Sequence, residues 1–288
     1  MLTIGPCELH SIETGRFRLD GGAMFGIVPR VLWEKVAPAD ELHRIQLSMR
    51  SLLAVDRRAG RVILVDSGAG DKWMSEEAAR FAFEVDHNRF DARLAELGLS
   101  CEAVTDVVVT HLHFDHNGGL TRWVGEPGGR LAPRFGNARH WLHRSHLEHA
   151  RSPTERDRAS FFARDFEPVA EAGLFELLEG ESPPCPIPAI QWFVSHGHTP
   201  YQLLPLFDDG RTRLLFTGDV IPTFAHLPLP WVMAYDLYPL VTMQEKRRIF
   251  SLCSETGLLL ASEHDPNLAA GAIDTSGRHP AVLHPIDL

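Results

Sequence analysis

The stretch that most constrains the fold is a run of metal-binding side chain types placed directly behind a predicted strand. Val107–Val109 are β-branched, as in a buried strand, and the sequence THLHFDHNGG follows them without a break. Alternate residues of an extended chain point the same way, so His111 and His113 can share one ion. Asp115 and His116 follow where the chain must turn, and they can face a second ion. A polar loop with accidental histidines does not explain this spacing.

This ten-residue stretch resembles the signature THxHxDHxGG of the metallo-β-lactamase superfamily, with every position filled. The resemblance implies an α/β (α+β) fold, a four-layer αβ/βα sandwich in which two mixed β-sheets face each other and helices cover the outside. The metals of such a fold sit at one open edge. We expect residues 1–288 to form a single domain of this type, since 44% hydrophobic residues are ample for a packed core.

Three further motifs follow in the family's order. His198 comes after a predicted strand and matches the histidine of the family motif GHTxG, although Tyr201 stands where a glycine is common. Asp219 ends another predicted strand, where a buried carboxylate is costly unless it pairs or binds a cation, and it matches the family's bridging aspartate. His264 matches the last histidine. The resemblance therefore implies seven ligands: His111, His113 and His198 for one ion, Asp115, His116 and His264 for the other, and Asp219 between them.

A short D-x-G motif follows the predicted strand at residues 61–65. Its aspartate, Asp66, matches a family residue that supports the metal ligands instead of binding metal itself. A plain turn-forming aspartate is the alternative. The segment inserted between the first and second ligand motifs is similar in placement to that of quorum-quenching lactonases and related methyl-parathion-type phosphotriesterases.

The ligand set indicates the chemistry. Nitrogen-rich ligation with carboxylates suits two divalent metal ions, zinc first and iron, manganese or cobalt next. Two ions about 3.5–4 Å apart can share a hydroxide whose pKa is lowered to about 7 from about 15.7. We expect this metal-bridging hydroxide to attack an ester, lactone or related uncharged substrate, which makes the chain a dinuclear metallo-hydrolase of the esterase or lactonase kind. Asp115, free to swing one oxygen off its metal, is the candidate to pass a proton to the leaving group.

Two apolar segments are candidates for the wall of a substrate pocket. The first spans residues 23–29 and follows a predicted turn at residues 20–22; the second is the proline-stiffened segment 221–236 after the bridging aspartate. Such a wall suits an uncharged ester or lactone. Core packing is the alternative for both segments. The candidate pocket residues are Phe25, Trp33, His226, Trp231 and Tyr235.

Four histidines, His140, His143, His146 and His149, repeat every three residues around a predicted strand at 139–143. On a helix this spacing could present imidazoles on one face for a metal. The segment opens as a strand, however, and charged residues are interleaved with the histidines, so we interpret it as a solvated face. A helix is then predicted to begin at residues 152–155 and to end before a proline at position 168.

Composition favours a small-molecule substrate over a macromolecular partner. The formal net charge of −10 argues against nucleic acid, and no run of apolar residues approaches the length of a membrane span. Four cysteines lie far apart without a Cys-x-x-Cys pair, which favours reduced thiols and a cytoplasmic location. The sequence leaves a homodimer open.

Several other functions compete with an ester or lactone hydrolase. They include a glyoxalase-II-like thioesterase, a phosphotriesterase and a mononuclear iron dioxygenase, although a dioxygenase would dispense with Asp115, His116 and His264. Net acidity disfavours a nuclease of the same superfamily, and the intact ligand set disfavours a non-catalytic scaffold. Acyl-homoserine lactonases similar to this chain often carry a tyrosine three residues after the bridging aspartate. This chain has Pro222 there, which weakens that specific assignment.

Overall fold

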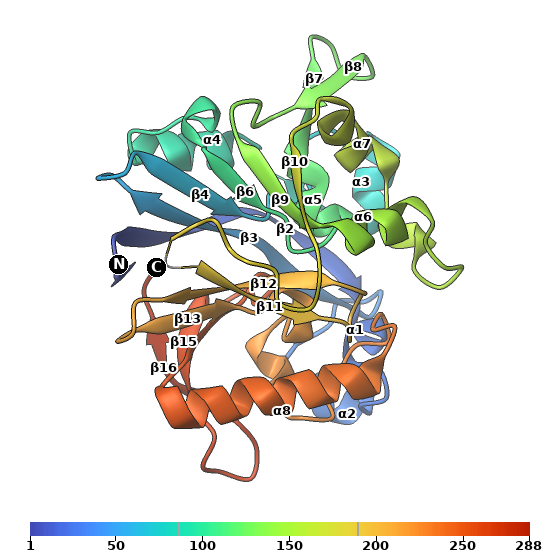
Figure 1. The fold of residues 1–288 in the computed structure, drawn as a ribbon. Helices are drawn as coiled ribbons and strands as arrows, with labels where there is room; N and C mark the ends of the chain where they lie inside the picture. Colours follow the sequence, from blue (N-terminus) through green and yellow to red (C-terminus); the bar gives the residue numbers. More distant parts are fainter. Residues whose placement is uncertain (86, 189) are drawn as a thin grey trace.

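The first half of the chain forms a mixed sheet (Figure 1). The structure is a computed structural model that describes residues 1–85, 87–188 and 190–288. The strands of this sheet are β1 (Leu2–Ile4), β2 (Cys7–Asp20), β3 (Arg44–Asp56), β4 (Arg61–Val65), β5 (Glu84–Val85), β6 (Asp106–Val108), β9 (Arg139–His143) and β10 (Phe175–Leu178). Strands β1 to β4 pair antiparallel in sequence order, and β5 pairs with β2. The neighbours β4, β6, β9 and β10 pair parallel.

The second half forms a six-stranded sheet whose strand order follows the sequence. Its strands are β11 (Ile190–Ser195), β12 (Gln202–Asp208), β13 (Arg213–Phe216), β14 (Leu259–Ala261), β15 (Ala270–Asp274) and β16 (Ala281–Ile286). Neighbours are antiparallel except β13 and β14, which are parallel, so this sheet is also mixed. A separate hairpin consists of β7 (Thr121–Val124) and β8 (Arg130–Pro133).

Helices cover the outer faces of both sheets. They are α1 (Gly21–Phe25), α2 (Arg30–Trp33), α3 (Ser75–Phe81), α4 (His87–Glu96), α5 (Phe114–Asn117), α6 (Arg144–Arg151), α7 (Ala163–Glu171) and α8 (Pro239–Thr256). Helices α3, α4, α6 and α7 lie outside the first sheet, and α8 lies along the outside of the second (Figure 1). The predicted four-layer αβ/βα sandwich is confirmed. Within the described residues, no helix combines the length and apolarity that a membrane span needs.

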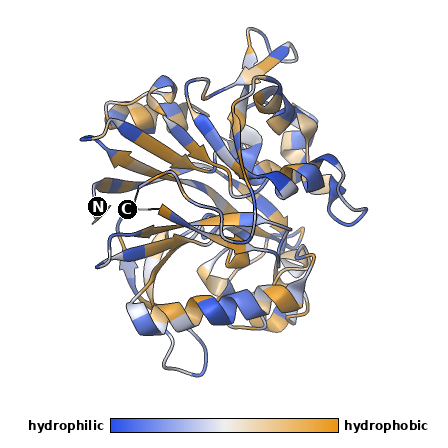
Figure 2. Cartoon of the chain, in the orientation of Figure 1, coloured by the Kyte–Doolittle hydropathy of each residue, from blue (hydrophilic) through white to orange (hydrophobic). Residues whose placement is uncertain are grey.

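The strand period of two explains why the sandwich has three apolar layers. On β3, Leu52 faces the second sheet and belongs to one cluster with Phe216, whereas its neighbour Leu53 faces outward and clusters with Leu94 of α4. A third cluster joins the outer face of the second sheet to Ile249 of α8. All five side chains are at most 1% exposed, and each such burial is worth about 1.5–3 kcal/mol. Hydrophobic residues accordingly concentrate on the strands of both sheets (Figure 2).

Two predictions of local structure are wrong. Residues 20–22 do not form a turn: Asp20 begins α1 as its N-cap, and its Oδ1 accepts a hydrogen bond from Ala23 N at 2.7 Å. The helix predicted to start at residues 152–155 begins instead at Ala163, and Pro168 lies inside it. A proline removes the hydrogen bond to the carbonyl four residues earlier, and here Thr121 Oγ1 donates to that carbonyl, Arg164 O, at 2.9 Å.

Candidate metal centre

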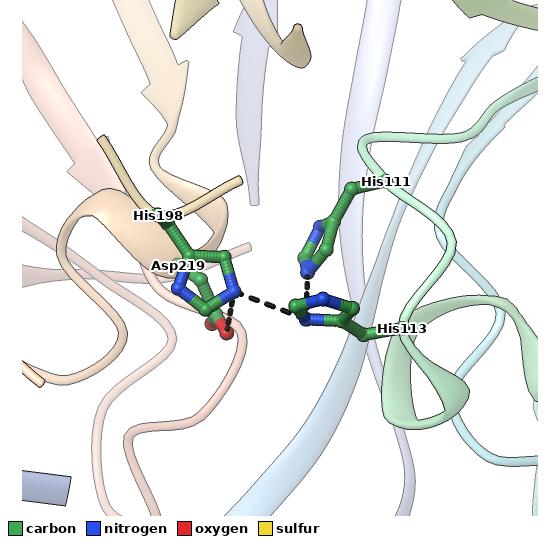
Figure 3. A group of neighbouring side chains, drawn as sticks. All are labelled: His111, His113, His198 and Asp219. Atoms are coloured by element: carbon green, nitrogen blue, oxygen red, sulfur yellow. Dashed lines mark hydrogen bonds and ion pairs between the residues drawn. The ribbon is translucent and has the colours of Figure 1, made fainter. Parts of the chain in front are cut away.

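Three histidines and one aspartate converge at the edge where the two sheets meet. The ligand-type atoms of His111, His113, His198 and Asp219 all lie within 4.8 Å of one another (Figure 3). His113 Nδ1 lies 3.1 Å from both His111 Nε2 and His198 Nε2. His198 Nε2 is also 3.2 Å from Asp219 Oδ2. The structure thus brings together the four residues expected around the first ion.

A second cluster adjoins the first through the same aspartate. Asp115, His116 and His264 also have their ligand-type atoms within 4.8 Å of one another. His264 Nε2 lies 3.1 Å from His116 Nε2 and 3.6 Å from Asp115 Oδ2. Asp219 Oδ1 lies 3.2 Å from His264 Nε2 and 3.4 Å from His116 Nε2. Because its other oxygen faces His198, Asp219 lies between the two clusters, as a bridging ligand would.

Every one of these side chains follows the carboxyl end of a strand. His111 and His113 come after β6, and α5 then holds Asp115 and His116. The other three follow β11, β13 and β14 of the second sheet. Loops at strand ends carry binding residues on a rigid scaffold, and here neither sheet supplies the full set alone.

Close backbone packing fixes the turn that carries α5. A Cβ added to Gly118 would lie 2.2 Å from Ala69 O, so only glycine allows the two loops to approach this closely. The buried Lys72 donates a hydrogen bond to Gly118 O and forms an ion pair with Asp165 Oδ1 at 2.8 Å. The loop after β4 therefore supports the turn beneath the clusters.

Of the five histidines in the two clusters, four have the ring nitrogen that faces away from the clusters, Nδ1, within hydrogen-bond distance of an oxygen atom. His198 Nδ1 lies 3.0 Å from Asp236 Oδ1, and His264 Nδ1 lies 2.8 Å from Ser48 O. A ring nitrogen that donates to such an acceptor keeps its proton, so the opposite nitrogen carries a lone pair. Both lone pairs, on Nε2, then point into the clusters.

The other two histidines with such a contact are His111 and His116, which Asp66 and Glu263 help to orient. Asp66 accepts hydrogen bonds from Thr110 N at 2.7 Å and Thr110 Oγ1 at 2.6 Å. The Thr110 hydroxyl is thereby left to accept from His111 Nδ1 at 3.0 Å. His116 Nδ1 lies 2.7 Å from Glu263 Oε2 and 3.1 Å from Asp66 Oδ2. Asp66 thus contacts His116 directly and His111 through Thr110.

Inward lone pairs 3.1 Å apart repel each other unless a cation lies among them, so the donor set fits divalent metal ions. Burial lowers the pKa of His111 and of His113 well below the usual histidine range, and neighbouring imidazoles add to the effect. Both are therefore held neutral, the form that binds metal. Burial acts to raise the pKa of Asp219, but His116, His198 and His264 outweigh it and hold that pKa well below the usual range.

The sequence reasoning missed Glu263 and Asp236. Both are almost fully buried, and both contact a histidine of the clusters. Burial is the main cause that raises the pKa of Glu263 to about 8. A signal for Glu263 existed, because it stands beside His264 at the end of a buried strand, where an unpaired carboxylate is costly. Asp236 carried no comparable signal.

The histidines expected on a solvated face are instead largely buried. His140, His143 and His146 are at most 1% exposed. His146 connects two ligand loops: its Nε2 accepts from Leu112 N at 2.8 Å, and its Nδ1 donates to Pro200 O at 2.7 Å. Buried polar groups need hydrogen-bond partners, and these partners lie too far away in the sequence for the three-residue spacing to reveal them.

Two more residues shape the loop of His198. Glu245 of α8 accepts hydrogen bonds from Ser195 Oγ at 2.8 Å and His196 N at 2.7 Å, so the helix fixes this loop directly. Tyr201 adopts a φ of 59°, in the left-handed region that favours glycine. This conformation explains why a glycine is common at the position. The Tyr201 ring stacks on His143 with the ring centres 4.4 Å apart.

A cavity of about 300 Å³ opens onto both clusters. Its lining includes His113, Asp115, His198, Asp219 and His264. Of the five candidate pocket residues, it includes Tyr235. Met24 and Met233, which belong to the two candidate wall segments, also line it. The remaining wall consists of residues outside those segments: Leu19, Leu47, Arg80, Phe81, Phe114, Ala159, Ser160 and Phe162.

The other four candidate pocket residues are not among the residues that line this cavity. Phe25 stacks on His226 with ring centres 4.5 Å apart, and also packs against Trp33 and Trp231. Burial lowers the pKa of His226 to about 3, and its ring nitrogens contact Thr223 Oγ1 and a backbone carbonyl. A neutral, hydrogen-bonded imidazole in an aromatic stack belongs to the core. Each segment therefore divides between the core and the cavity wall, which includes Met24 of the first segment and Met233 and Tyr235 of the second.

A four-layer sandwich with histidines and aspartates gathered at strand ends defines a metal-binding protein of the αβ/βα class. The family described as the metallo-beta-lactamase superfamily matches residues 51–252. The chain belongs to this superfamily.

Solved structures of other proteins share the whole fold. A probable metal-dependent hydrolase from Staphylococcus aureus is 26% identical, with a TM-score of 0.86 over 99% of this chain and 100% of that one. AidC, a dizinc quorum-quenching lactonase in complex with the product N-hexanoyl-L-homoserine, is 16% identical, with a TM-score of 0.78 over 100% and 97%. The hydrolase AbOPH of the beta-lactamase superfamily is 19% identical, with a TM-score of 0.77 over 100% and 97%.

Proposed function

We propose that this protein is a metal-dependent hydrolase that holds two divalent ions, with zinc as the preferred metal, and that it cleaves an ester or lactone bond. The observation that carries the proposal is the pair of clusters that share Asp219, with imidazole lone pairs turned inward. When bound, two such ions supply a water of lowered pKa as nucleophile and polarise the carbonyl of the substrate. His111, His113 and His198 would hold one ion and Asp115, His116 and His264 the other.

Asp115 is proposed to move the proton. Asp115 lines the cavity, and its Oδ2 lies 3.6 Å from His264 Nε2, farther than the 3.1 Å between His264 Nε2 and His116 Nε2. The Asp115 carboxylate is therefore placed to take a proton from water and deliver it to the leaving oxygen. Such general acid–base steps contribute roughly 10²–10⁴-fold to a rate.

The cavity wall supports an acyl substrate. Apolar side chains of Leu19, Met24, Leu47, Phe114 and Met233 surround the clusters, so they exclude water from the reacting carbonyl and accept a hydrocarbon chain. The second cluster also disfavours a mononuclear dioxygenase, which would have no use for it. Lactonase structures that share the fold are consistent with this proposal.

Metal content and turnover test the proposal together. Metal-free protein titrated with zinc in a calorimeter should bind about two equivalents per chain. Zinc-loaded protein should hydrolyse aryl esters or lactones, and His113→Ala should lose this activity while it keeps its fold. His279→Ala, the same change at an exposed histidine, is the matched control. Unchanged turnover in His113→Ala would falsify the proposal.

Asp115→Asn separates proton transfer from metal binding. We expect its rate to fall strongly for esters of alkyl alcohols, whose leaving groups need a proton. The fall should be much smaller for nitrophenyl esters, whose leaving group departs as a stable anion. Zinc titration of the same variant shows how much of the loss comes from the ion. An equal loss for both leaving groups would contradict the proton-transfer role.

A further inference from the structure

Arg80 is the one arginine or lysine among the described residues that line the cavity. It lies in the last turn of α3, and its side chain is exposed. The other fixed charges in the cavity wall are the carboxylates of Asp115 and Asp219, which belong to the clusters. A lone guanidinium in a wall whose other side chains away from the clusters are mainly apolar is a recognition element for an anionic group.

The guanidinium has no protein partner among the described residues, although the chain is rich in acids. Glu76 stands four residues before Arg80 on the same helix, yet no ion pair joins them, and Glu77 Oε2 instead lies 3.0 Å from Arg164 Nη2. The arginines that do form ion pairs include Arg30, Arg44, Arg134, Arg144, Arg151, Arg164 and Arg213. Interaction with the α3 dipole explains a cation near the helix end, but it does not require one in the cavity wall.

The neighbour of Arg80 in the sequence packs against the metal-binding turn. Phe81 packs on Phe114 with the ring centres 4.7 Å apart, and Phe114 lies between His113 and Asp115 in the sequence. The ring centre of Trp73 lies 5.8 Å from that of Phe81 and 5.5 Å from that of Phe114. An aromatic cluster therefore joins α3 to the metal-binding turn, and Arg80 is the neighbour of Phe81 in this cluster.

We infer that the substrate carries a carboxylate at the end remote from the scissile bond, and that Arg80 binds it. This inference rests on the proposed function and names its substrate class: esters or lactones whose acyl chain ends in an anionic group. The apolar wall accommodates the chain between the two ends. A guanidinium matches a carboxylate with two parallel hydrogen bonds, so Arg80 determines specificity and takes no part in bond cleavage.

Two nitrophenyl esters that differ only at the remote end test the inference. The hexanoate ester ends in a methyl group, and the adipate monoester of the same chain length ends in a carboxylate. We expect Arg80→Ala to lower the ratio of kcat/KM for the adipate ester over the hexanoate ester by roughly threefold to tenfold, through KM. Arg80→Glu should lower it further, and Arg80→Lys less than alanine. In the wild-type protein, added salt should weaken the preference, because the site is exposed.

Arg247→Ala, which removes an exposed arginine of α8 outside the cavity, is the matched control and should leave the ratio unchanged. An equal ratio in Arg80→Ala and the wild-type protein would overturn the inference while ester hydrolysis itself stands. If zinc-loaded protein hydrolyses neither ester, the proposed function fails, and calorimetric binding of adipate against hexanoate decides the role of Arg80. A preference for adipate that Arg80→Ala abolishes would support it, and no preference would overturn it.

Discussion

His146 offers the sharpest test of how the fold organises the metal centre. It contacts neither cluster through a hydrogen bond, yet it joins Leu112, between His111 and His113, to Pro200, two residues after His198. We therefore expect His146→Ala to loosen the two ligand loops relative to each other. The change should weaken zinc binding as well as the fold.

The magnitude follows from the two hydrogen bonds. Removal of the imidazole leaves the buried N–H of Leu112 without a partner, which costs about 1–3 kcal/mol, whereas the partly buried C=O of Pro200 can turn to water at a smaller cost. The free energy of unfolding should therefore fall by about 1–3 kcal/mol or somewhat more, a sizeable share of the roughly 5–15 kcal/mol of a typical domain. Changes in residues that orient metal ligands usually lower metal affinity by roughly 10–100-fold, and we expect His146→Ala to fall in this range.

His140→Ala provides the control, since His140 is an equally buried histidine of the same segment whose hydrogen bond goes to Ala138 O. Urea unfolding of the metal-free proteins measures stability, and competition with a chromophoric chelator measures zinc affinity. Both variants should be destabilised, but only His146→Ala should bind zinc more weakly. Equal zinc affinities in the two variants would refute the reasoning, because burial alone would then explain His146.

Three further outcomes follow from the contacts at the site. Glu263→Gln weakens the 2.7 Å contact with His116 Nδ1, so it should lower the affinity for the second ion by roughly 10–100-fold and leave the affinity for the first ion unchanged. Zinc calorimetry measures both affinities, and an equal loss of the two would contradict this prediction. Gly118→Ala should lower the free energy of unfolding by about 1–3 kcal/mol in urea, since its Cβ meets a backbone oxygen, whereas Gly136→Ala, with open space around it, should not. Zinc at about 100 times its dissociation constant should stabilise the protein by about 2.7 kcal/mol, so a chelator should lower Tm, and an unchanged Tm would exclude binding to the folded state.

The sequence predicts the fold class because its signals are local. Apolar runs mark the strands β6, β11, β13 and β14, and metal-binding residue types follow each of these four strands within a few residues, so each motif is visible locally. The supporting contacts are different in kind. Asp66 contacts His116 across 50 residues, His146 contacts Pro200 across 54, and Glu245 contacts Ser195 across 50. The resemblance to a family identified Asp66, whereas no local pattern identified the other two.

Two of the differences from the predictions share a physical cause. The predictions place a boundary at a helix-breaking residue and a polar residue in the pocket, but other groups accommodate both inside the folded chain. Thr121 supplies the hydrogen bond that makes Pro168 tolerable within α7. Phe25 and Thr223 make His226 a core residue, by stacking and by hydrogen bonding. Tertiary context of this kind overrides local propensity, and it is absent from the order of residues.

The placement of the clusters between the two sheets gives the metal a structural consequence. His111, His113, Asp115 and His116 follow the first sheet, whereas His198, Asp219 and His264 follow the second. Without ions, inward lone pairs lie 3.1 Å apart across this junction and repel each other. A divalent ion held by His113 and His198, or by His116 and His264, would join the two sheets. The free energy that a chelator removes should therefore be lost mainly from the contact between the sheets, so amides of the ligand loops should lose protection from hydrogen exchange before those of β2 and β3.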